Sequence, residues 1–334
     1  MQTLFKNANL IDISSGIISN VDILVRDQKI ESIARGLDEK CEIVDLNGNY
    51  VLPGFANVFC DSQKAYAQSS GNWIAQDNIK EIFDQKNALA GVVFQNDLSY
   101  TSATCLEGIS EREEKELSQF SNQVAKDKSL LFLKVGQSLD ELGQIDKTYK
   151  KPLSQVLEDF GFLDRKPVVV GGNCFEKDEL QLFSQYECGF CITPSEDGRM
   201  ARRPTNLLAL KSLDFRVGIG SGYSFEVDFF AFMRQIVLTQ RGLFEDVDCI
   251  SEQEVLKLAT INSGDILGCD LTVKEENFAN FIVVRYSESI YNNIFKTLIW
   301  EKSKQDVLYT IKNGKIIQKN GEILIGLAKN YGKI

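Results

Sequence analysis

Apolar residues recur at two different spacings along this chain, and the change of spacing divides it into three parts. Near the start, Val21, Ile23 and Val25 occupy every second position and so fall on one face of a strand. Towards the end, Asn-Gly pairs at 313–314 and 320–321 separate short apolar runs, which is typical of β-hairpins. Both ends of the chain are therefore predicted to be rich in strands and to form one small β domain together.

The middle of the chain alternates short apolar runs with longer amphipathic stretches. The runs that predict strands lie at 90–94, 130–135, 167–170, 189–193 and 215–219. The stretches that predict helices lie at 78–89, 111–125, 177–186 and 228–238. Alternation of strand and helix implies a parallel sheet with crossover helices. We count seven strands in the middle segment rather than eight, so a (β/α)8 barrel that is trimmed or distorted stays open.

A length of 334 residues suits one large domain and a smaller one. We expect a composite β-sandwich domain from residues 1–50 and 271–334, and an α/β barrel of the TIM type from residues 51–270. The formal net charge of −10 argues against nucleic acid or an anionic membrane as the main partner. Without a secretory signal or a membrane-spanning run, a cytoplasmic protein is expected.

Eight cysteines in such a chain are expected to be reduced thiols. Cys188 and Cys191 form a C-x-x-C pair, but they lie in an apolar, strand-like run. A structural zinc site would need two further ligands nearby, and neither a second pair nor a histidine is available. We interpret these residues as buried strand cysteines.

Four segments resemble the amidohydrolase superfamily, and most closely its cytosine deaminase and chlorohydrolase-like branch, which includes aminofutalosine deaminases. The matching segments are Leu4–Ala8 through Val51-Leu52-Pro53-Gly54-Phe55, then Leu258–Gly268, Ala279–Val283 and Lys312–Lys315. The resemblance covers nearly the whole chain and implies a hydrolase of non-peptide carbon–nitrogen bonds on a barrel. In active members, histidines from three strands and an aspartate from a fourth hold a metal that activates water.

The resemblance also locates the positions of that metal site, and the residues found there are unusual. The counterparts of the metal ligands and of the proton-shuttling glutamate are Phe59, Asp61, Lys134, Gln137, Gly171 and Gly222. The chain contains no histidine. No metal or other cofactor is therefore predicted, and a non-catalytic binding or scaffolding protein, or pseudoenzyme, is the function expected. The alternative is a hydrolase or deaminase of a cyclic amide, amidine or aminopurine that works without metal.

Several polar residues remain candidates for binding a ligand. They are Asp61, Lys134, Gln137, Asn173, Ser195, Arg199, Arg202 and Ser221. We expect Lys134 and Asp61 to form an internal ion pair in place of the metal, with a solvated lysine as the alternative. Arg199, Arg202 and Arg203 lie near a glycine-rich turn and could bind a small anion, or else could be solvated residues of a loop beside Glu196 and Asp197. A homodimer, or a complex with an active relative, is the expected assembly.

Overall fold

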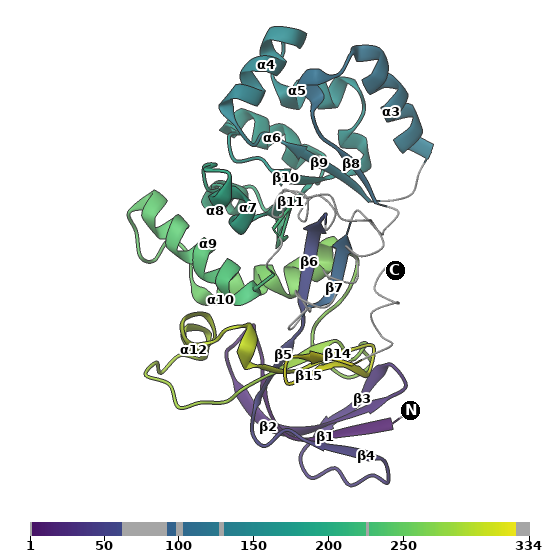
Figure 1. Ribbon diagram of the computed structural model, residues 1–334, viewed down its shortest axis with the longest axis vertical. Coiled ribbons are helices and arrows are strands. Elements are labelled where there is room, and N and C mark those ends of the chain that lie inside the picture. The colour runs from purple at the N-terminus through teal and green to yellow at the C-terminus, as the bar shows by residue number, and fades with distance from the viewer. Residues whose placement is uncertain (1, 62–91, 98–102, 127–129, 225–226, 325–334) are drawn as a thin grey trace.

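The computed structural model describes residues 2–61, 92–97, 103–126, 130–224 and 227–324, and the structural statements below refer to these residues. Within them the chain has a mixed α/β fold with a parallel sheet, as predicted. The helix predicted at 78–89 lies outside the described residues. Figure 1 shows the β-rich chain ends below and the parallel strands with their helices above.

The two ends of the chain meet in one nine-stranded sheet. Its strands from the N-terminal end are β1 (Gln2–Ile11), β2 (Ile18–Arg26), β3 (Lys29–Ala34), β4 (Glu42–Asp45) and β5 (Tyr50–Pro53). Those from the C-terminal end are β13 (Phe281–Val284), β14 (Val307–Lys312), β15 (Lys315–Lys319) and β16 (Glu322–Ile323). Antiparallel pairing of β5 with β13 joins the two sets. The predicted Asn-Gly pairs make the turns between β14, β15 and β16.

A second set of strands is parallel throughout. A five-stranded sheet has the order β12-β11-β10-β9-β8, and β6 pairs with β7. Their bounds are β6 (Phe55–Cys60), β7 (Val92–Asp97), β8 (Thr104–Leu106), β9 (Leu131–Val135), β10 (Val168–Gly171), β11 (Gly189–Ile192) and β12 (Arg216–Ile219). A parallel bridge from Cys60 to Gly222 connects β6 to the chain just after β12. The C-terminal ends of these strands therefore converge on one face.

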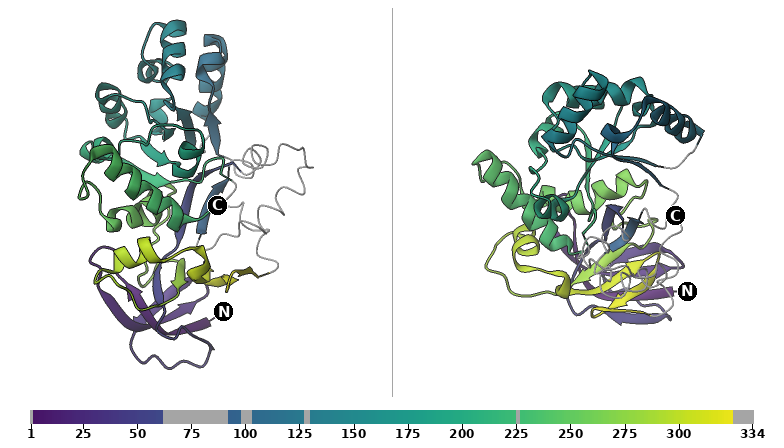
Figure 2. Two further views of the ribbon diagram at one scale, coloured as in Figure 1. Left: turned by 60° about the vertical axis from the view of Figure 1, so that its left-hand side comes forward. Right: turned by 45° about the horizontal axis from the view of Figure 1, so that its top comes forward.

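Most helices follow the parallel strands and cover their outer side, whereas the last helix follows β13 of the terminal sheet, as Figures 1 and 2 show. They are α3 (Glu114–Lys126), α4 (Leu139–Tyr149), α5 (Leu153–Asp159), α6 (Lys177–Gln185), α7 (Pro194–Arg199), α8 (Leu207–Ser212), α9 (Phe229–Phe244), α10 (Glu252–Ala259), α11 (Ile261–Ile266) and α12 (Ile294–Glu301). Short 3-10 turns lie at η1 (Ile109–Glu111), η2 (Leu163–Arg165) and η3 (Lys304–Asp306). The helix predicted at 111–125 thus begins three residues later, since Glu111 ends the turn η1.

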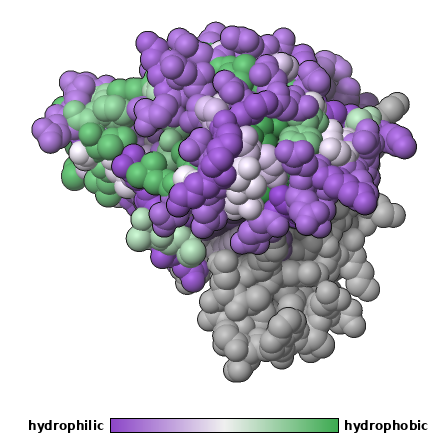
Figure 3. Space-filling view, turned by 90° about the horizontal axis from the view of Figure 1, so that it is seen from above, coloured by the Kyte–Doolittle hydropathy of each residue, from purple (hydrophilic) through white to green (hydrophobic). Residues whose placement is uncertain are grey.

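The surface seen from above is largely hydrophilic, with hydrophobic residues gathered on the side where α9 lies (Figure 3). Leu238 and Leu243 of α9 and the nearby Val247 are among the exposed large apolar side chains. In the described part of the chain, no helix is both long and apolar enough to cross a bilayer. Cys188 and Cys191 are buried free thiols, and burial raises the pKa of Cys188 to about 12.

Candidate functional site

Alternation along β9 places a charged residue in the interior. Leu131, Leu133 and Val135 pack in the large core that includes the helices, whereas Phe132 faces the smaller core inside the parallel strands. Because strand side chains alternate between faces, Lys134 shares the inner face with Phe132. Only 4% of Lys134 is exposed. Burial lowers the pKa of its ammonium, and the charge of Glu196 opposes that shift.

The ion-pair partner of Lys134 is Glu196, which α7 supplies directly after β11. Lys134 Nζ lies 2.7 Å from Glu196 Oε1, and both side chains are 3% exposed. The same ammonium lies 3.0 Å from the centre of the Tyr223 ring and 5.5 Å from that of Phe59. Lys134 is therefore a buried cation that is paired with a carboxylate and packed against aromatic rings. A buried ion pair was predicted, but with Asp61 as the partner of Lys134 instead of Glu196.

Three donors hold the Glu196 carboxylate in place. Besides Lys134, Arg202 Nη1 donates to Oε1 at 2.8 Å, and the backbone N–H of Tyr223 donates to Oε2 at 2.8 Å. Burial alone would raise the pKa of Glu196, but the charge of Lys134 and the hydrogen bonds hold it below its usual range. Glu196 is therefore an anion that organises the chain segments after β9, β11 and β12.

Gly222 leaves the space that this carboxylate occupies. A Cβ atom at Gly222 would lie 2.2 Å from Glu196 Oε2, well inside contact distance. Its φ of +60° also lies in the left-handed region that glycine tolerates best. Gly222 stands at the position that resembles the family's metal-binding aspartate. It therefore contributes no side chain there, and the Glu196 carboxylate occupies the space.

Arg202 and Asp197 extend the charged network away from Lys134. Arg202 Nη1 lies 3.6 Å from Asp197 Oδ1, so Arg202 is paired with both Glu196 and Asp197. Asn173 donates to Asp197 Oδ2 at 3.1 Å. Burial raises the pKa of Asp197 to about 6, against the lowering effects of Asn173 and Arg202.

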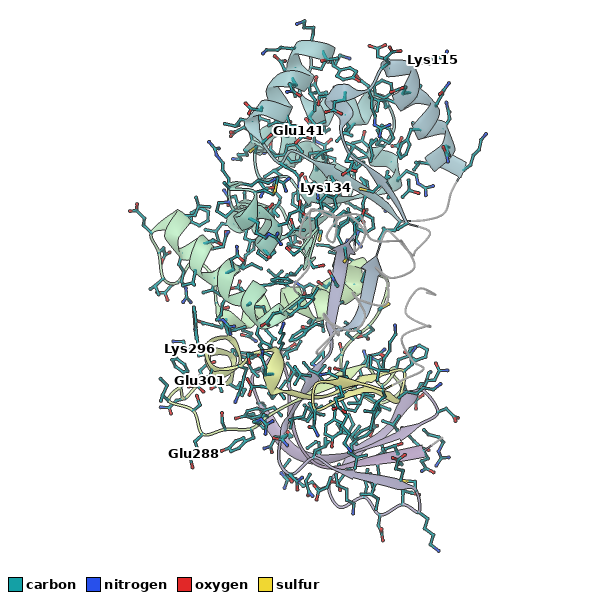
Figure 4. The ribbon with its side chains drawn as sticks, in the orientation of Figure 1. Lys115, Lys134, Glu141, Glu288, Lys296 and Glu301 are labelled. Atoms are coloured by element: carbon teal, nitrogen blue, oxygen red, sulfur yellow. The ribbon has the colours of Figure 1, made fainter. Side chains whose placement is uncertain are left out.

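A polar cavity of about 580 Å³ opens at the ends of β8 and β9. Its lining residues are Glu107, Gly108, Glu111, Arg112, Glu116, Lys134, Gln137 and Glu141. Figure 4 shows Lys134 and Glu141 near the junction of the parallel strands with the helices above them. The lining holds four carboxylates and two cations. It is therefore suited to a polar ligand that carries hydrogen-bond donors or positive charge.

Glu141 lies in the first turn of α4, four residues after Gln137, and its carboxylate reaches back to the Gln137 backbone. Its two carboxylate oxygens accept hydrogen bonds from the backbone N–H groups of Gly136 (3.2 Å) and Gln137 (2.9 Å). Ser138 caps α4 by accepting from the Glu141 N–H, and this cap fixes the start of the helix. Burial raises the pKa of Glu141 in spite of these bonds. A raised carboxyl pKa suits proton transfer near neutral pH.

A second cavity of about 290 Å³ lies on the other side of the Lys134 pair. Its lining residues are Glu196, Arg199, Met200, Tyr223 and Ser224. Tyr223 borders this cavity, and its hydroxyl donates to Glu107 Oε2 at 2.6 Å in the wall of the larger cavity. Of the three predicted anion-binding arginines, Arg199 lines this 290 Å³ cavity, whereas Arg202 is held by the carboxylates.

The remaining predicted residues are spread around this centre. Phe59 is fully buried and packs on Phe132 with ring centres 5.4 Å apart. Asp61 is 8% exposed and directly follows β6, where its N–H donates to Gly222 O. Ser221 is bound to Asn57, and Ser195 is half-buried on α7.

Four important residues were missed: Glu107, Glu141, Glu196 and Tyr223. The sequence held a signal for two of them. Ser138-x-x-Glu141 has the spacing of a capping box at a helix start, directly after the segment of Lys134 and Gln137. Glu196 follows β11, and parallel strands bring their C-terminal ends to one edge.

The donor atoms at this centre do not match those of a zinc site. Zinc is held by thiolate, imidazole or carboxylate groups, commonly from three or four residues. Phe59, Lys134 and Gly171 offer none of these groups. Across the ranges that the structure describes, no group of three or more histidine, cysteine, aspartate or glutamate residues could hold a metal ion.

No model of a known protein family matches the chain. In sequence it is similar to 5-methylthioadenosine/S-adenosylhomocysteine deaminases. That of Thermococcus onnurineus is 23% identical over 216 residues, which are 63% of this chain and 50% of the relative. That of Halothermothrix orenii is 27% identical over 202 residues, 57% of this chain and 46% of the relative. The chain thus spans about half the length of the curated relatives it matches.

Solved structures share the fold. An adenosine deaminase from Xanthomonas campestris with bound zinc aligns with a TM-score of 0.81 at 12% identity, covering 98% of this chain and 97% of that one. The atrazine chlorohydrolase TrzN from Arthrobacter aurescens with zinc gives 0.81 at 16% identity, with 97% of each chain covered. Guanine deaminase from E. coli gives 0.77 at 12% identity, covering 96% and 99%.

These comparisons contradict the prediction of a non-catalytic binding or scaffolding protein. The similar sequences are named as deaminases and the similar structures as deaminases or hydrolases. The interpretation that leaned away from an enzyme is therefore not supported, and the alternative of carbon–nitrogen bond hydrolysis agrees better with the findings. The sequence relatives and structural neighbours of this chain are deaminases and hydrolases of the amidohydrolase superfamily, which its motifs had indicated.

Proposed function

We propose that this chain hydrolyses an exocyclic C–N bond of an aminopurine nucleoside in the 580 Å³ cavity at the ends of β8 and β9. The observation that carries the proposal is Glu141, a carboxylate of raised pKa that lines the same polar cavity as Lys134. The names of the sequence relatives support an aminopurine substrate. The acidic lining supports a substrate that presents amino groups.

The reaction needs one water molecule and yields ammonia. The water oxygen forms a bond to the ring carbon, and the bond from that carbon to the amino group breaks. Glu141 accepts one proton from the water and passes it to the leaving amino group, while the second proton ends on the ring nitrogen. Lys134 contributes a fixed positive charge beside the ring nitrogen, where negative charge develops during attack.

This proposal includes a site that works without zinc. Its support is the donor set, because a lysine, a phenylalanine and a glycine stand at positions that resemble metal ligands. The ammonium of Lys134 and the proton-transfer group of Glu141 then supply the polarising charge and the base. No step of the reaction is assigned to a metal.

We also propose the finer architecture that the motifs indicated. The parallel strands would form a trimmed barrel, supported by the bridge from Cys60 to Gly222 that links β6 to the segment after β12. The chain ends, 1–50 with 271–334, would form a β-sandwich domain beside a barrel of residues 51–270. Pairing of β5 with β13 supports that division. A homodimer, or a complex with a relative, remains a prediction. Measurement of the molecular mass in solution would test it.

The test is turnover of 5′-methylthioadenosine, S-adenosylhomocysteine and adenosine, followed by ammonia release and by the change in purine absorbance. Glu141→Gln should lower kcat by about 100-fold or more, the usual range for a general acid–base group. Glu179→Gln is the matched control. Glu179 also occupies the third position of a capped helix, and burial raises its pKa, but it does not line the cavity.

Three results would count against the proposal. Absence of ammonia release from all three nucleosides and from the free bases would refute the deaminase function. Activity that disappears with a chelator and returns with added zinc would refute the metal-independent site but leave deamination standing. Equal losses in Glu141→Gln and Glu179→Gln would show that Glu141 acts only through folding.

A further inference from the structure

Glu107 and Lys134 lie at matching positions where two neighbouring strands end. β8 pairs in parallel with β9, and Leu106 lies opposite Leu133. The next position along each strand is Glu107 on one and Lys134 on the other. Both residues line the 580 Å³ cavity. A carboxylate and an ammonium therefore stand on the same wall of this cavity.

Alternation along β8 directs Glu107 towards the interior of the parallel strands. Leu106 packs in the large core with the helices, whereas Cys105 packs against the smaller inner core. Because strand side chains alternate between faces, Glu107 shares the inner face with Cys105. Burial lowers the pKa of Lys134, and the charge of Glu107 is among those that oppose this shift. The two charges are therefore close enough to influence each other.

Tyr223 holds the Glu107 carboxylate in a fixed orientation. Its hydroxyl donates to Glu107 Oε2 at 2.6 Å, and its ring lies 3.0 Å from Lys134 Nζ. Its backbone N–H donates to Glu196 Oε2, which fixes the start of the side chain. Burial raises the pKa of the Tyr223 hydroxyl, and the bond to Glu107 raises it further, so the phenol remains a donor. One side chain thus contacts both charges and sets their spacing.

An ammonium near a carboxylate matches one edge of an aminopurine. On that edge a ring nitrogen with a lone pair stands next to the carbon that bears the amino group. The ammonium of Lys134 has three hydrogens, of which Glu196 takes one, so another can be donated to the ring nitrogen. An ionised carboxylate only accepts, so Glu107 suits the N–H groups of the amino substituent.

Deamination reverses this pattern. The product has a carbonyl oxygen in place of the amino group and a hydrogen on the ring nitrogen. Its oxygen would face the Glu107 carboxylate, and its ring N–H would face the Lys134 ammonium. Each contact would leave polar groups unpaired, and a site built for one hydrogen-bond pattern rejects a ligand with the other.

We propose that Glu107 and Lys134 recognise the amino edge of the substrate and distinguish it from the oxopurine product, with Tyr223 as the positioning residue of Glu107. The proposal rests on the proposed deaminase function for the identity of the ring. Glu107 receives a hydrogen bond from the amino group that leaves. Repulsion between Glu107 and the new carbonyl oxygen then favours release of the product.

The first test is calorimetric binding of adenosine and inosine, which differ only at this edge, to Glu141→Gln, in which turnover should be slow. Adenosine should bind about 10- to 100-fold more tightly, the range expected when a buried polar group is left unpaired. Adding Glu107→Gln should bring the two affinities close together, because an amide can also donate to the carbonyl oxygen. Adding Glu114→Gln, an exposed carboxylate of α3 outside the cavity lining, should preserve the preference.

Equal affinity for the two nucleosides before Glu107 is changed, or binding of neither, would overturn the recognition, whatever the turnover. The same preference before and after Glu107→Gln would overturn it too. A preference that Glu107→Gln abolishes, in a protein whose wild type releases no ammonia from any nucleoside, would refute the proposed function but leave the recognition standing.

The second test isolates the positioning role. Tyr223→Phe keeps the ring against Lys134 and removes the hydroxyl, so the preference for adenosine should fall about fivefold, as for the loss of one hydrogen bond. Tyr186→Phe is the matched control, because the Tyr186 hydroxyl also donates to a glutamate, Glu158, at 2.8 Å, and neither residue lines the cavity. It should keep the wild-type preference. An unchanged preference in Tyr223→Phe, or an equal fall in both variants, would overturn the positioning role.

Discussion

The nine-stranded sheet of the chain ends and the parallel strands between them are filled in opposite ways. The core of the terminal sheet is apolar and includes Phe5, Val51 and Phe281, with the two phenylalanine rings edge to face at 5.3 Å. Inside the parallel strands, the rings of Tyr223 and Phe59 lie against Lys134 of the Lys134–Glu196 ion pair. The terminal sheet buries the carboxylate of Asp22 against backbone N–H groups, whereas the parallel strands bury a cation together with its carboxylate partner.

The difference has an energetic meaning. Apolar burial stabilises a fold directly, whereas a buried ion pair costs desolvation energy that its attraction only partly recovers. A chain that needed only stability would have no reason to keep Lys134 and Glu196 in its interior. We therefore associate the terminal sheet with stability and the centre of the parallel strands with chemistry.

Truncation of the apolar core should have the largest effect. Phe281→Ala removes a fully buried ring and should lower the free energy of unfolding by about 4 kcal/mol, measured by denaturant titration. Phe278→Ala is the control, since that ring is 48% exposed, and it should cost less than about 1 kcal/mol. If the two variants lose equal stability, the terminal sheet does not have the stabilising role given to it here.

Removal of the buried cation should have the next largest effect. Lys134→Met leaves Glu196 with Arg202 as its charged partner, and we expect a loss of about 3 kcal/mol in unfolding free energy. The exposed Lys115→Met, on α3, should be nearly neutral. The double variant Lys134→Met with Glu196→Gln should lose less unfolding free energy than the two single variants lose when their losses are added. Strict additivity would mean that the pair is not coupled.

The pH dependence of stability gives a third, smaller contrast. The pKa of Asp197 is raised from 3.8 to about 6, so the folded chain binds this proton more tightly than the unfolded chain. Its stabilising contribution is therefore present below about pH 4 and is lost as pH rises to about 6, by roughly 2–3 kcal/mol. The difference in unfolding free energy between wild type and Asp197→Asn across this window isolates the effect. A constant difference would contradict the shift.

The smallest expected effect concerns the anion that Arg199 could bind in the 290 Å³ cavity, which stays a proposal. Inorganic phosphate should bind weakly by calorimetry, and Arg199→Gln should weaken it about fivefold, or by about 1 kcal/mol. Arg203→Gln, an exposed arginine of the same loop, is the control. Equal affinity in all three proteins would remove Arg199 from the list of ligand contacts.

Periodicity predicted most of the parallel strands, because each is a short apolar run that is buried on both faces. The runs around 131–135, 168–171 and 216–219 are examples. The Asn-Gly turns predicted the C-terminal hairpins for a similarly local reason, since this dipeptide favours the left-handed backbone that such turns need. Local pattern and local structure agree in these elements.

The site could be predicted only in part, because its partners come from different strands. Lys134 was identified on β9, but its partner Glu196 lies 62 positions later and is brought close by β10 and β11. Asp61 was the predicted partner because Asp61 and Lys134 both stand at positions that resemble metal ligands of the family. Such a resemblance does not give the distance between two side chains.

The close approach of Glu196 to Gly222 makes residues 196 and 222 mutually dependent in evolution. Any side chain introduced at 222 must displace the carboxylate that holds Lys134, so a mutation there is tolerated only after 196 has changed. Because of this dependence, an aspartate cannot be introduced at position 222 in one step. Directed evolution of this chain would therefore have to search the two codons together.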